Sequence, residues 1–205
     1  MTGNSPEPGW PGNPAKISDP HMLRALAHPA RVKILAFLAT EGPATATECA
    51  TVAGLSPSAC SYHLRALAQY GFVEEDRDSS TDGRQRPWRC RIFSLQWYSK
   101  AGPGMELAGE MLQQTVRTEV DEMRAAYLDR KPEYPPEWRS VLGNYTDVLH
   151  VTPEELEDFQ NEMVEFFGRY RRLSRDERPP GAKRVSVLID FNPWFAPDEP
   201  AGEAS

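Results

Sequence analysis

The sequence lacks the features that mark membrane proteins and disulfide-rich secreted proteins. No apolar run approaches the length needed to cross a bilayer, and residues 1–15 are polar and rich in glycine and proline, unlike a signal peptide. The three cysteines, Cys49, Cys60 and Cys90, are too few and odd in number for a disulfide framework. We therefore expect a cytoplasmic protein with reduced thiols and no membrane partner.

Motifs of catalysis and metal binding are also missing. The four histidines have no partnered nucleophile pattern, and the chain has no Gly-rich phosphate loop, His-Glu-x-x-His or Gly-x-Ser-x-Gly. Zinc or arsenic sites need several converging thiol or imidazole ligands, whereas Cys60 fits a core position as a small apolar residue. Redox sensing by a single thiol is not favoured, because no neighbouring cation clearly lowers the pKa of a thiol. We expect neither an enzyme nor a metal protein, and assign no cofactor.

Positive charge is in the minority, with 23 Lys/Arg against 30 Asp/Glu and a net charge of −7. Taken alone, this balance argues against a nucleic-acid partner. The charge is unevenly distributed, however: residues 16–100 hold 11 Lys/Arg and 8 Asp/Glu, whereas residues 101–205 hold 12 and 21. The N-terminal half is therefore suited to contact phosphates, which the acidic C-terminal half would repel.

Composition and chain breaks divide the sequence into five regions, and predict a mostly helical α+β fold. The expected regions are a disordered tail (1–15), a domain of short helices with a hairpin (16–100), a long helix (101–131), a small α+β domain (132–195) and a second disordered tail (196–205).

Capping signals place four short helices in the first domain. Ser18 or Asp19 caps the first, and Pro29 begins the second, which ends near residue 39. Thr45 and its partner Glu48 form a capping box for the third helix. The fourth, residues 57–70, begins after Ser56 and ends at a glycine, and strands over 72–75 and 88–95 follow.

The long helix and the C-terminal region follow the break at residues 102–104. An apolar stripe over 105–130 predicts one helix, which we expect to pair with its copy in a second chain; packing within its own chain is the alternative. Residues 138–151 are a possible strand, 153–173 a capped helix and 184–191 an alternating strand. The C-terminal aromatic residues are expected to be ordinary core, with an unidentified effector pocket as the alternative.

The fourth helix carries the chemistry that suits a DNA groove. At 100° per residue, Cys60, Leu64 and Leu67 share the inward face. The outward face offers small hydroxyl groups near the N-terminus and a long cation further along, which suit base edges and phosphates. Its predicted members are Ser58, Ser61, Tyr62, Arg65 and Gln69, with Ser56 at the helix N-terminus and His63 on the flank, within reach of backbone oxygens. A merely solvent-exposed amphipathic helix is the alternative.

The hairpin after this helix has a basic tip. Four arginines, Arg84, Arg86, Arg89 and Arg91, fall within eight residues without an acidic residue between them. Such a tip suits the minor groove and phosphates beside a helix in the major groove. The alternative is a solvated loop that the acidic residues at 74–78 neutralise.

Two stretches resemble the ArsR-type winged helix-turn-helix regulators. They are Leu26-Ala27-His28-Pro29-Ala30-Arg31-Val32-Lys33-Ile34-Leu35 and Leu55-Ser56-Pro57-Ser58-Ala59-Cys60-Ser61-Tyr62-His63-Leu64-Arg65-Ala66-Leu67, the latter followed by Tyr70-Gly71-Phe72-Val73.

The resemblance covers about residues 18–98 and implies a homodimeric transcriptional regulator that binds a palindromic operator in double-stranded DNA. It implies that Ser58, Ser61, Tyr62, His63 and Arg65 lie at DNA-reading positions, and it matches Arg84 and Arg86 to the wing. The sequence departs from the metal-sensing members, because the long helix has no histidine and residues 47–50 have one thiol. We expect a repressor; the alternative function is a winged-helix protein-interaction module without DNA binding.

Overall fold

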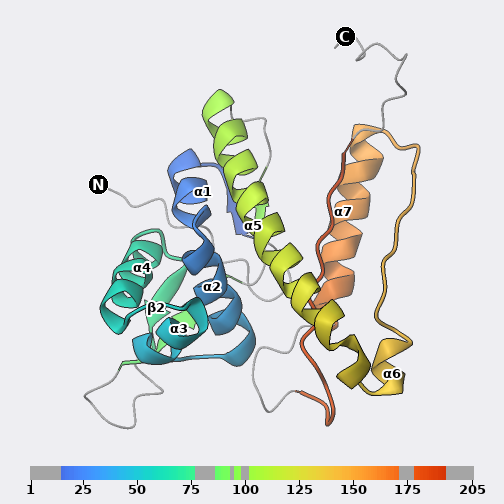
Figure 1. Ribbon diagram of the computed structural model, residues 1–205. Coiled ribbons are helices and arrows are strands. Elements are labelled where there is room, and N and C mark those ends of the chain that lie inside the picture. Colours follow the sequence, from blue (N-terminus) through green and yellow to red (C-terminus); the bar gives the residue numbers. More distant parts are fainter. Residues whose placement is uncertain (1–14, 77–85, 93–94, 98–101, 171–177, 193–205) are drawn as a thin grey trace.

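The computed structural model of the chain describes residues 15–76, 86–92, 95–97, 102–170 and 178–192. The fold is mostly helical, with two small two-stranded sheets (Figure 1). Its elements in chain order are β1 (Ala15–Ile17), α1 (Pro20–Leu26), α2 (Pro29–Glu41), α3 (Ala46–Ala53), α4 (Pro57–Gln69), β2 (Val73–Glu75), β3 (Trp88–Cys90), β4 (Leu95–Trp97), α5 (Pro103–Arg130), the 3-10 turn η2 (Lys131–Glu133), α6 (Pro136–Arg139) and α7 (Pro153–Gly168). The expected disordered tails fall almost entirely on residues 1–14 and 193–205, which lie outside the described ranges.

Proline and capping side chains begin the first two helices where the sequence predicts. The carboxylate of Asp19 accepts the N–H of His21 at 2.8 Å and so caps α1. His28 has the same role for α2, because its Nδ1 accepts the N–H of Ala30 at 3.2 Å. The imidazole of His28 is thereby fixed at the start of α2, a role that the sequence did not reveal.

The next two helices form the helix-turn-helix unit. Thr45 and Glu48 form the predicted capping box of α3. Gly54, at φ 66°, ends α3 in the left-handed conformation, and Ser56 then caps α4. Gly71, at φ 73°, supplies the predicted stop after α4. Gly54 and Ser56 therefore define the short turn between α3 and α4.

The wing is a short antiparallel pair of β2 and β3, with Val73 opposite Cys90. Backbone hydrogen bonds between Ala44 and Trp88, at 2.9 and 2.7 Å, join the base of the wing to the end of α2. The expected strand over 88–95 ends at Cys90: Arg91 and Ile92 are not strand residues, residues 93–94 lie outside the described ranges, and Leu95 belongs to another strand. The chain continues instead into β4, which pairs in parallel with β1, a strand that the sequence did not predict.

One hydrophobic core lies between α1, α2, α4, the wing and the first half of α5. Its largest fully buried side chains are Leu23, Leu26, Ile34, Leu38, Leu64, Leu67, Phe72, Met105 and Leu112. Because such cores are closely packed, they fix the orientation of the helices that carry them. The outward face of α4 is thus held in place by its buried face.

The apolar stripe of α5 is divided between two uses. Met105, Ala108 and Leu112 are buried in the core against α1, so the first half of the stripe packs within its own chain. Met123, further along the same stripe, is 51% exposed. The first half of α5 thus packs within its own chain, while the pairing of this helix with a second copy stays a prediction. None of the helices in the described ranges has the length and apolarity needed to cross a membrane.

An ion pair joins α2 to α5. The Lys33 ammonium lies 3.3 Å from carboxylate oxygens of both Glu119 and Glu122. Glu119 is buried, and its hydrogen bond is the main cause that raises the pKa of Lys33. Because a buried carboxylate needs a paired cation, this contact fixes the angle between α2 and α5.

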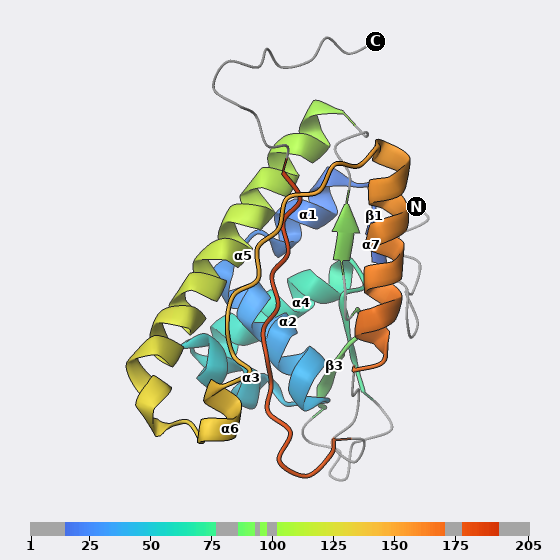
Figure 2. The same ribbon diagram turned by 90° about the vertical axis from the view of Figure 1, so that its right-hand side faces the viewer.

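The C-terminal region, residues 132–192, differs from the expected α+β domain. The capping box at Thr152 begins α7 as predicted, but α7 ends at Gly168 rather than near residue 173. Among the described residues, neither 138–151 nor 184–191 pairs as a strand, so both strand predictions are wrong for the single chain. The segment 138–151 begins in α6 and a turn and then continues without regular secondary structure toward α7, and residues 178–192 run as extended chain beside α7 (Figures 1 and 2).

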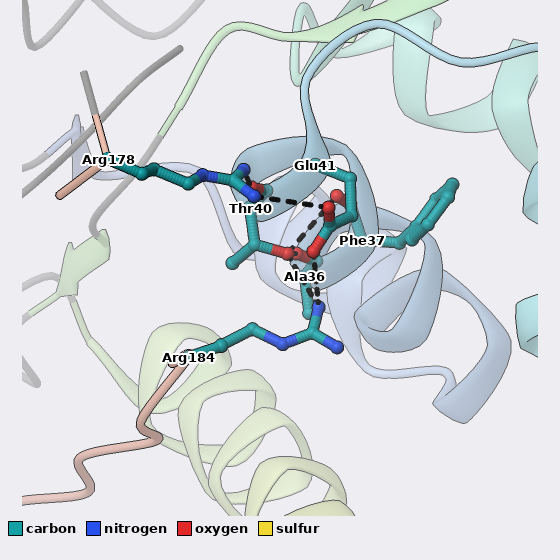
Figure 3. Close-up of polar contacts among 6 residues, drawn as sticks. All are labelled: Ala36, Phe37, Thr40, Glu41, Arg178 and Arg184. Atoms are coloured by element: carbon teal, nitrogen blue, oxygen red, sulfur yellow. Dashed lines mark hydrogen bonds and ion pairs between the residues drawn. The ribbon is translucent and has the colours of Figure 1, made fainter. Parts of the chain in front are cut away.

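Two arginines, Arg178 and Arg184, attach the segment after α7 to the C-terminus of α2 (Figure 3). The guanidinium of Arg178 donates to the Thr40 carbonyl and lies 3.3 Å from the Glu41 carboxylate. Arg184 donates to Thr40 Oγ1 at 2.7 Å and lies 3.6 Å from the same carboxylate. The negative end of the α2 dipole adds to this attraction. We call residues 178–192 the C-terminal strap.

Candidate nucleic-acid interface

The outward face of α4 is open to solvent. Tyr62 is 64% exposed, and Ser58, Arg65 and Gln69 are also exposed. Cys60, Leu64 and Leu67 point into the core, as the helical periodicity predicts. Among the described residues, Arg65 forms no ion pair. This face therefore presents a phenol, an amide and a cation on a helix of about three and a half turns.

The hydroxyl groups at the start of α4 have partners within the helix. Ser56 Oγ accepts the N–H of Ala59 at 3.3 Å and lies 3.1 Å from Ser58 Oγ. Ser61 donates its hydroxyl to the Pro57 carbonyl at 2.8 Å. Ser61 is only half-buried, but its proton is already used, so Ser58 and Tyr62 are the more available hydroxyl groups of the predicted set.

His63 does not lie on the flank as the sequence suggested. The side chain is buried, its ring centroid is 4.6 Å from that of His28, and Arg31 Nε donates to its Nδ1 at 3.4 Å. Arg31 also donates to the Ala25 carbonyl at 2.7 Å. His63 thus links α4 to α2 and the end of α1, and its burial does not favour the DNA contact predicted for it.

The environment of His63 predicts a loss of stability in mild acid. Burial, then the nearby His28 and Arg31, lower the pKa of His63. The unfolded chain therefore binds a proton more readily, so the free energy of unfolding should fall as pH drops below about 6.5 toward the lowered pKa. We expect His63→Gln to flatten this part of the stability–pH profile, measured by urea unfolding. An unchanged profile in the variant would contradict the assignment, and His150→Gln, at an exposed position, is the matched control.

The arginines of the wing are paired with acidic residues of the facing strand. Arg89 lies 2.6 Å from a carboxylate oxygen of Glu74, Arg91 lies 3.6 Å from the other oxygen, and Arg86 lies 3.0 Å from Glu75. Arg84 lies outside the described residues. The neutralisation that the sequence left open as an alternative is thus present at the base of the wing. These pairs are largely exposed, so each contributes little to stability.

The three thiols are buried, as the sequence predicts for Cys60 alone. Burial raises the pKa of Cys49 to about 12 and that of Cys90 to about 11, and burial also raises the pKa of Cys60. Cys49 and Cys60 lie against each other across α3 and α4, a contact that the sequence spacing did not predict. Among the described residues, no three His, Cys, Asp or Glu side chains gather as a metal site.

The similarity to known families and curated proteins falls on the helix-turn-helix part of the chain. Residues 26–76 match the family described as a helix-turn-helix domain. The HTH-type transcriptional regulator YgaV of Escherichia coli (strain K12) is 36% identical over 58 residues, which cover 28% of this chain and 59% of that protein. A probable mercury resistance operon repressor of Streptomyces lividans is 44% identical over 56 residues, covering 27% and 44%. The match spans about half the length of these curated relatives.

Among solved structures, the homodimeric winged helix-turn-helix DNA-binding domain Mb0332 from Mycobacterium bovis, a possible ArsR-family transcriptional regulator, is 23% identical. It aligns with 52% of this chain and 80% of its own, at a TM-score of 0.31. Residues 26–76 of this chain are thus similar to a helix-turn-helix domain and to parts of two transcriptional regulators.

Proposed function

We propose that this chain is a sequence-specific DNA-binding transcriptional regulator that acts as a homodimer, and that it represses transcription by occupying a promoter. The exposed outward face of α4 is the observation that supports this proposal. The buried side chains of α4 fix the orientation of the helix, and its outward side chains suit a DNA groove. The relatives with transcriptional regulation in their names support it.

In the proposed complex, α4 enters the major groove. The small Ser58 at its N-terminal end permits close approach, and the first N–H groups of the helix face a phosphate. Tyr62 and Arg65 follow on the same face one turn apart, where a guanidinium can bind guanine or phosphate. Arg86 and Arg89 of the wing would bind phosphates of the DNA backbone only after their ion pairs with Glu75 and Glu74 break.

A second copy of the chain is proposed to bring a second α4 to the neighbouring groove. Four large apolar side chains of α5 are exposed in the single chain, Leu107 at 53%, Met111 at 46%, Met123 at 51% and Leu128 at 51%. Leu107 and Met111 lie one turn apart on the same side of the helix, and we propose that pairing of two copies through α5 places the recognition helices about one DNA turn (~34 Å) apart on a palindromic operator.

The ion-paired wing favours the alternative function, a winged-helix module that binds protein rather than DNA. If Arg86 and Arg89 stay bound to Glu75 and Glu74, the wing offers little net positive charge. The two functions differ in their dependence on salt, because phosphate contacts release counterions and lose affinity steeply as salt rises.

The test is selection of duplexes from a random pool with the purified full-length protein. We expect an enriched palindrome, bound more tightly than the unselected pool and with a steep loss of affinity as salt rises. Failure to enrich any duplex, or binding to the pool that is independent of salt, would contradict the proposed function.

A further inference from the structure

The C-terminal region lacks a core of its own in the single chain. Among the described residues from 131 to 192, none is buried. Ordering each residue costs about 1–2 kcal/mol of backbone entropy, which apolar burial must offset. The capping box and proline that begin α7, and the alternating sequence of the strap, are nevertheless those of an ordered domain. The described part of the single chain therefore does not supply the burial that an ordered C-terminal region needs.

The exposed apolar surface of this region is large. Thirteen big apolar side chains are at least 37% exposed, in three segments that lie side by side in Figures 1 and 2. They are Val141, Tyr145, Val148, Leu149, Val151, Phe159, Phe166, Tyr170, Val185, Val187, Leu188, Ile189 and Phe191. Together they offer on the order of 1,000 Å² per chain, more than the largest patch of a typical monomer and similar to one side of a standard interface.

The strap holds this surface in a fixed place. Arg178 and Arg184 attach its first half to the end of α2 (Figure 3), and Asp190 accepts hydrogen bonds from Gln113 at 3.0 Å and Arg117 at 2.6 Å on α5. Phe191 meets Phe159 of α7, with ring centroids 5.9 Å apart. Between these attachments, the backbone of residues 185–189 pairs with no strand of the described chain. The strap is therefore an extended segment with an open hydrogen-bonding edge.

We propose that a second copy of this chain covers the strap, so that the straps of two copies pair edge to edge and the two C-terminal regions share one apolar core. An unpaired extended edge is a template for another strand, and two identical edges can pair about a two-fold axis, with each copy giving and receiving the same contacts. The strap also contacts α5 through Asp190, which binds Gln113 and Arg117 of that helix. This inference rests on the proposed homodimer and names the surface that the second copy covers.

The experiment uses the full-length protein in two measurements. Sedimentation equilibrium gives the dimer dissociation constant, and hydrogen exchange read by mass spectrometry follows the amides of residues 184–191 over a dilution series. We expect these amides to be protected where the chain is dimeric and to exchange freely on dilution. Val187→Arg, at a position 59% exposed in the single chain, should raise the dissociation constant at least about tenfold, because it buries a charge in the shared core.

The matched control is Val52→Arg, at a position 46% exposed on α3, which should leave the dissociation constant unchanged. A dimer that keeps its dissociation constant in Val187→Arg, with strap amides unprotected in the wild type, would overturn the strap pairing and leave the homodimer intact. Protection that persists in the monomer would show that the chain's own residues cover the strap, and also overturns the proposal. A wild-type protein that is monomeric at every concentration of the dilution series also overturns the strap pairing. DNA binding is tested separately, by the duplex selection.

Discussion

Arg65→Ala is expected to lower the affinity for the selected duplex about 5- to 150-fold, or ~1–3 kcal/mol, and to relax base preference at one position of each half-site. The reason is its place on the exposed face of α4, where it forms no ion pair among the described residues and its helix is fixed by Leu64 and Leu67. A fluorescence anisotropy titration on the selected duplex and on single-base variants measures both effects.

The control for Arg65 is another exposed arginine away from α4. Arg24→Ala on α1 removes the same charge and should change affinity little. Arg86→Ala should weaken binding modestly and to a similar extent on all sequences, because a phosphate contact carries no base information. If Arg65→Ala and Arg24→Ala have the same effect, α4 is not the helix that reads the operator.

Phe72→Ala is expected to lower the free energy of unfolding by about 3–5 kcal/mol, a large share of the 5–15 kcal/mol typical of a domain. Phe72 is fully buried directly after the glycine that ends α4, and its ring lies 6.3 Å from that of Tyr70. Its N–H donates to the Leu67 carbonyl, and its carbonyl accepts the N–H of Arg91. The substitution therefore leaves a cavity where α4 joins the wing.

Urea unfolding monitored by circular dichroism measures this loss. Val52→Ala removes apolar atoms from an exposed position and should cost less than about 0.5 kcal/mol. A Phe72→Ala protein as stable as Val52→Ala would show that the junction between α4 and the wing is not part of the core.

The sequence predicted the helix starts well because their signals are local. Asp19, Thr45, Ser56 and Thr152 each cap a helix through a hydrogen bond to an N–H two or three residues away, as the structure shows. The inward face of α4 followed from periodicity alone, since Cys60, like its neighbours on that face, is buried.

The features that sequence reasoning missed depend on distant residues. His63 is buried because Arg31, 32 positions earlier, donates to it, and no local pattern encodes that contact. The parallel pairing of β1 with β4 joins residues about eighty positions apart. The alternation over 184–191 predicted a strand, but a strand needs a neighbouring edge, and the single chain offers none in its described part.

The burial of Cys49, Cys60 and Cys90 has a practical consequence for spectroscopy. Their thiol pKa values all lie above the ordinary one, so at neutral pH these sulfur atoms are protonated as well as shielded from reagents. A cysteine introduced at a surface position away from the outward face of α4, such as Val52, would be the reactive one. A maleimide dye or nitroxide could then be attached there in the wild-type background, and would report distances between two bound copies without removing any native thiol.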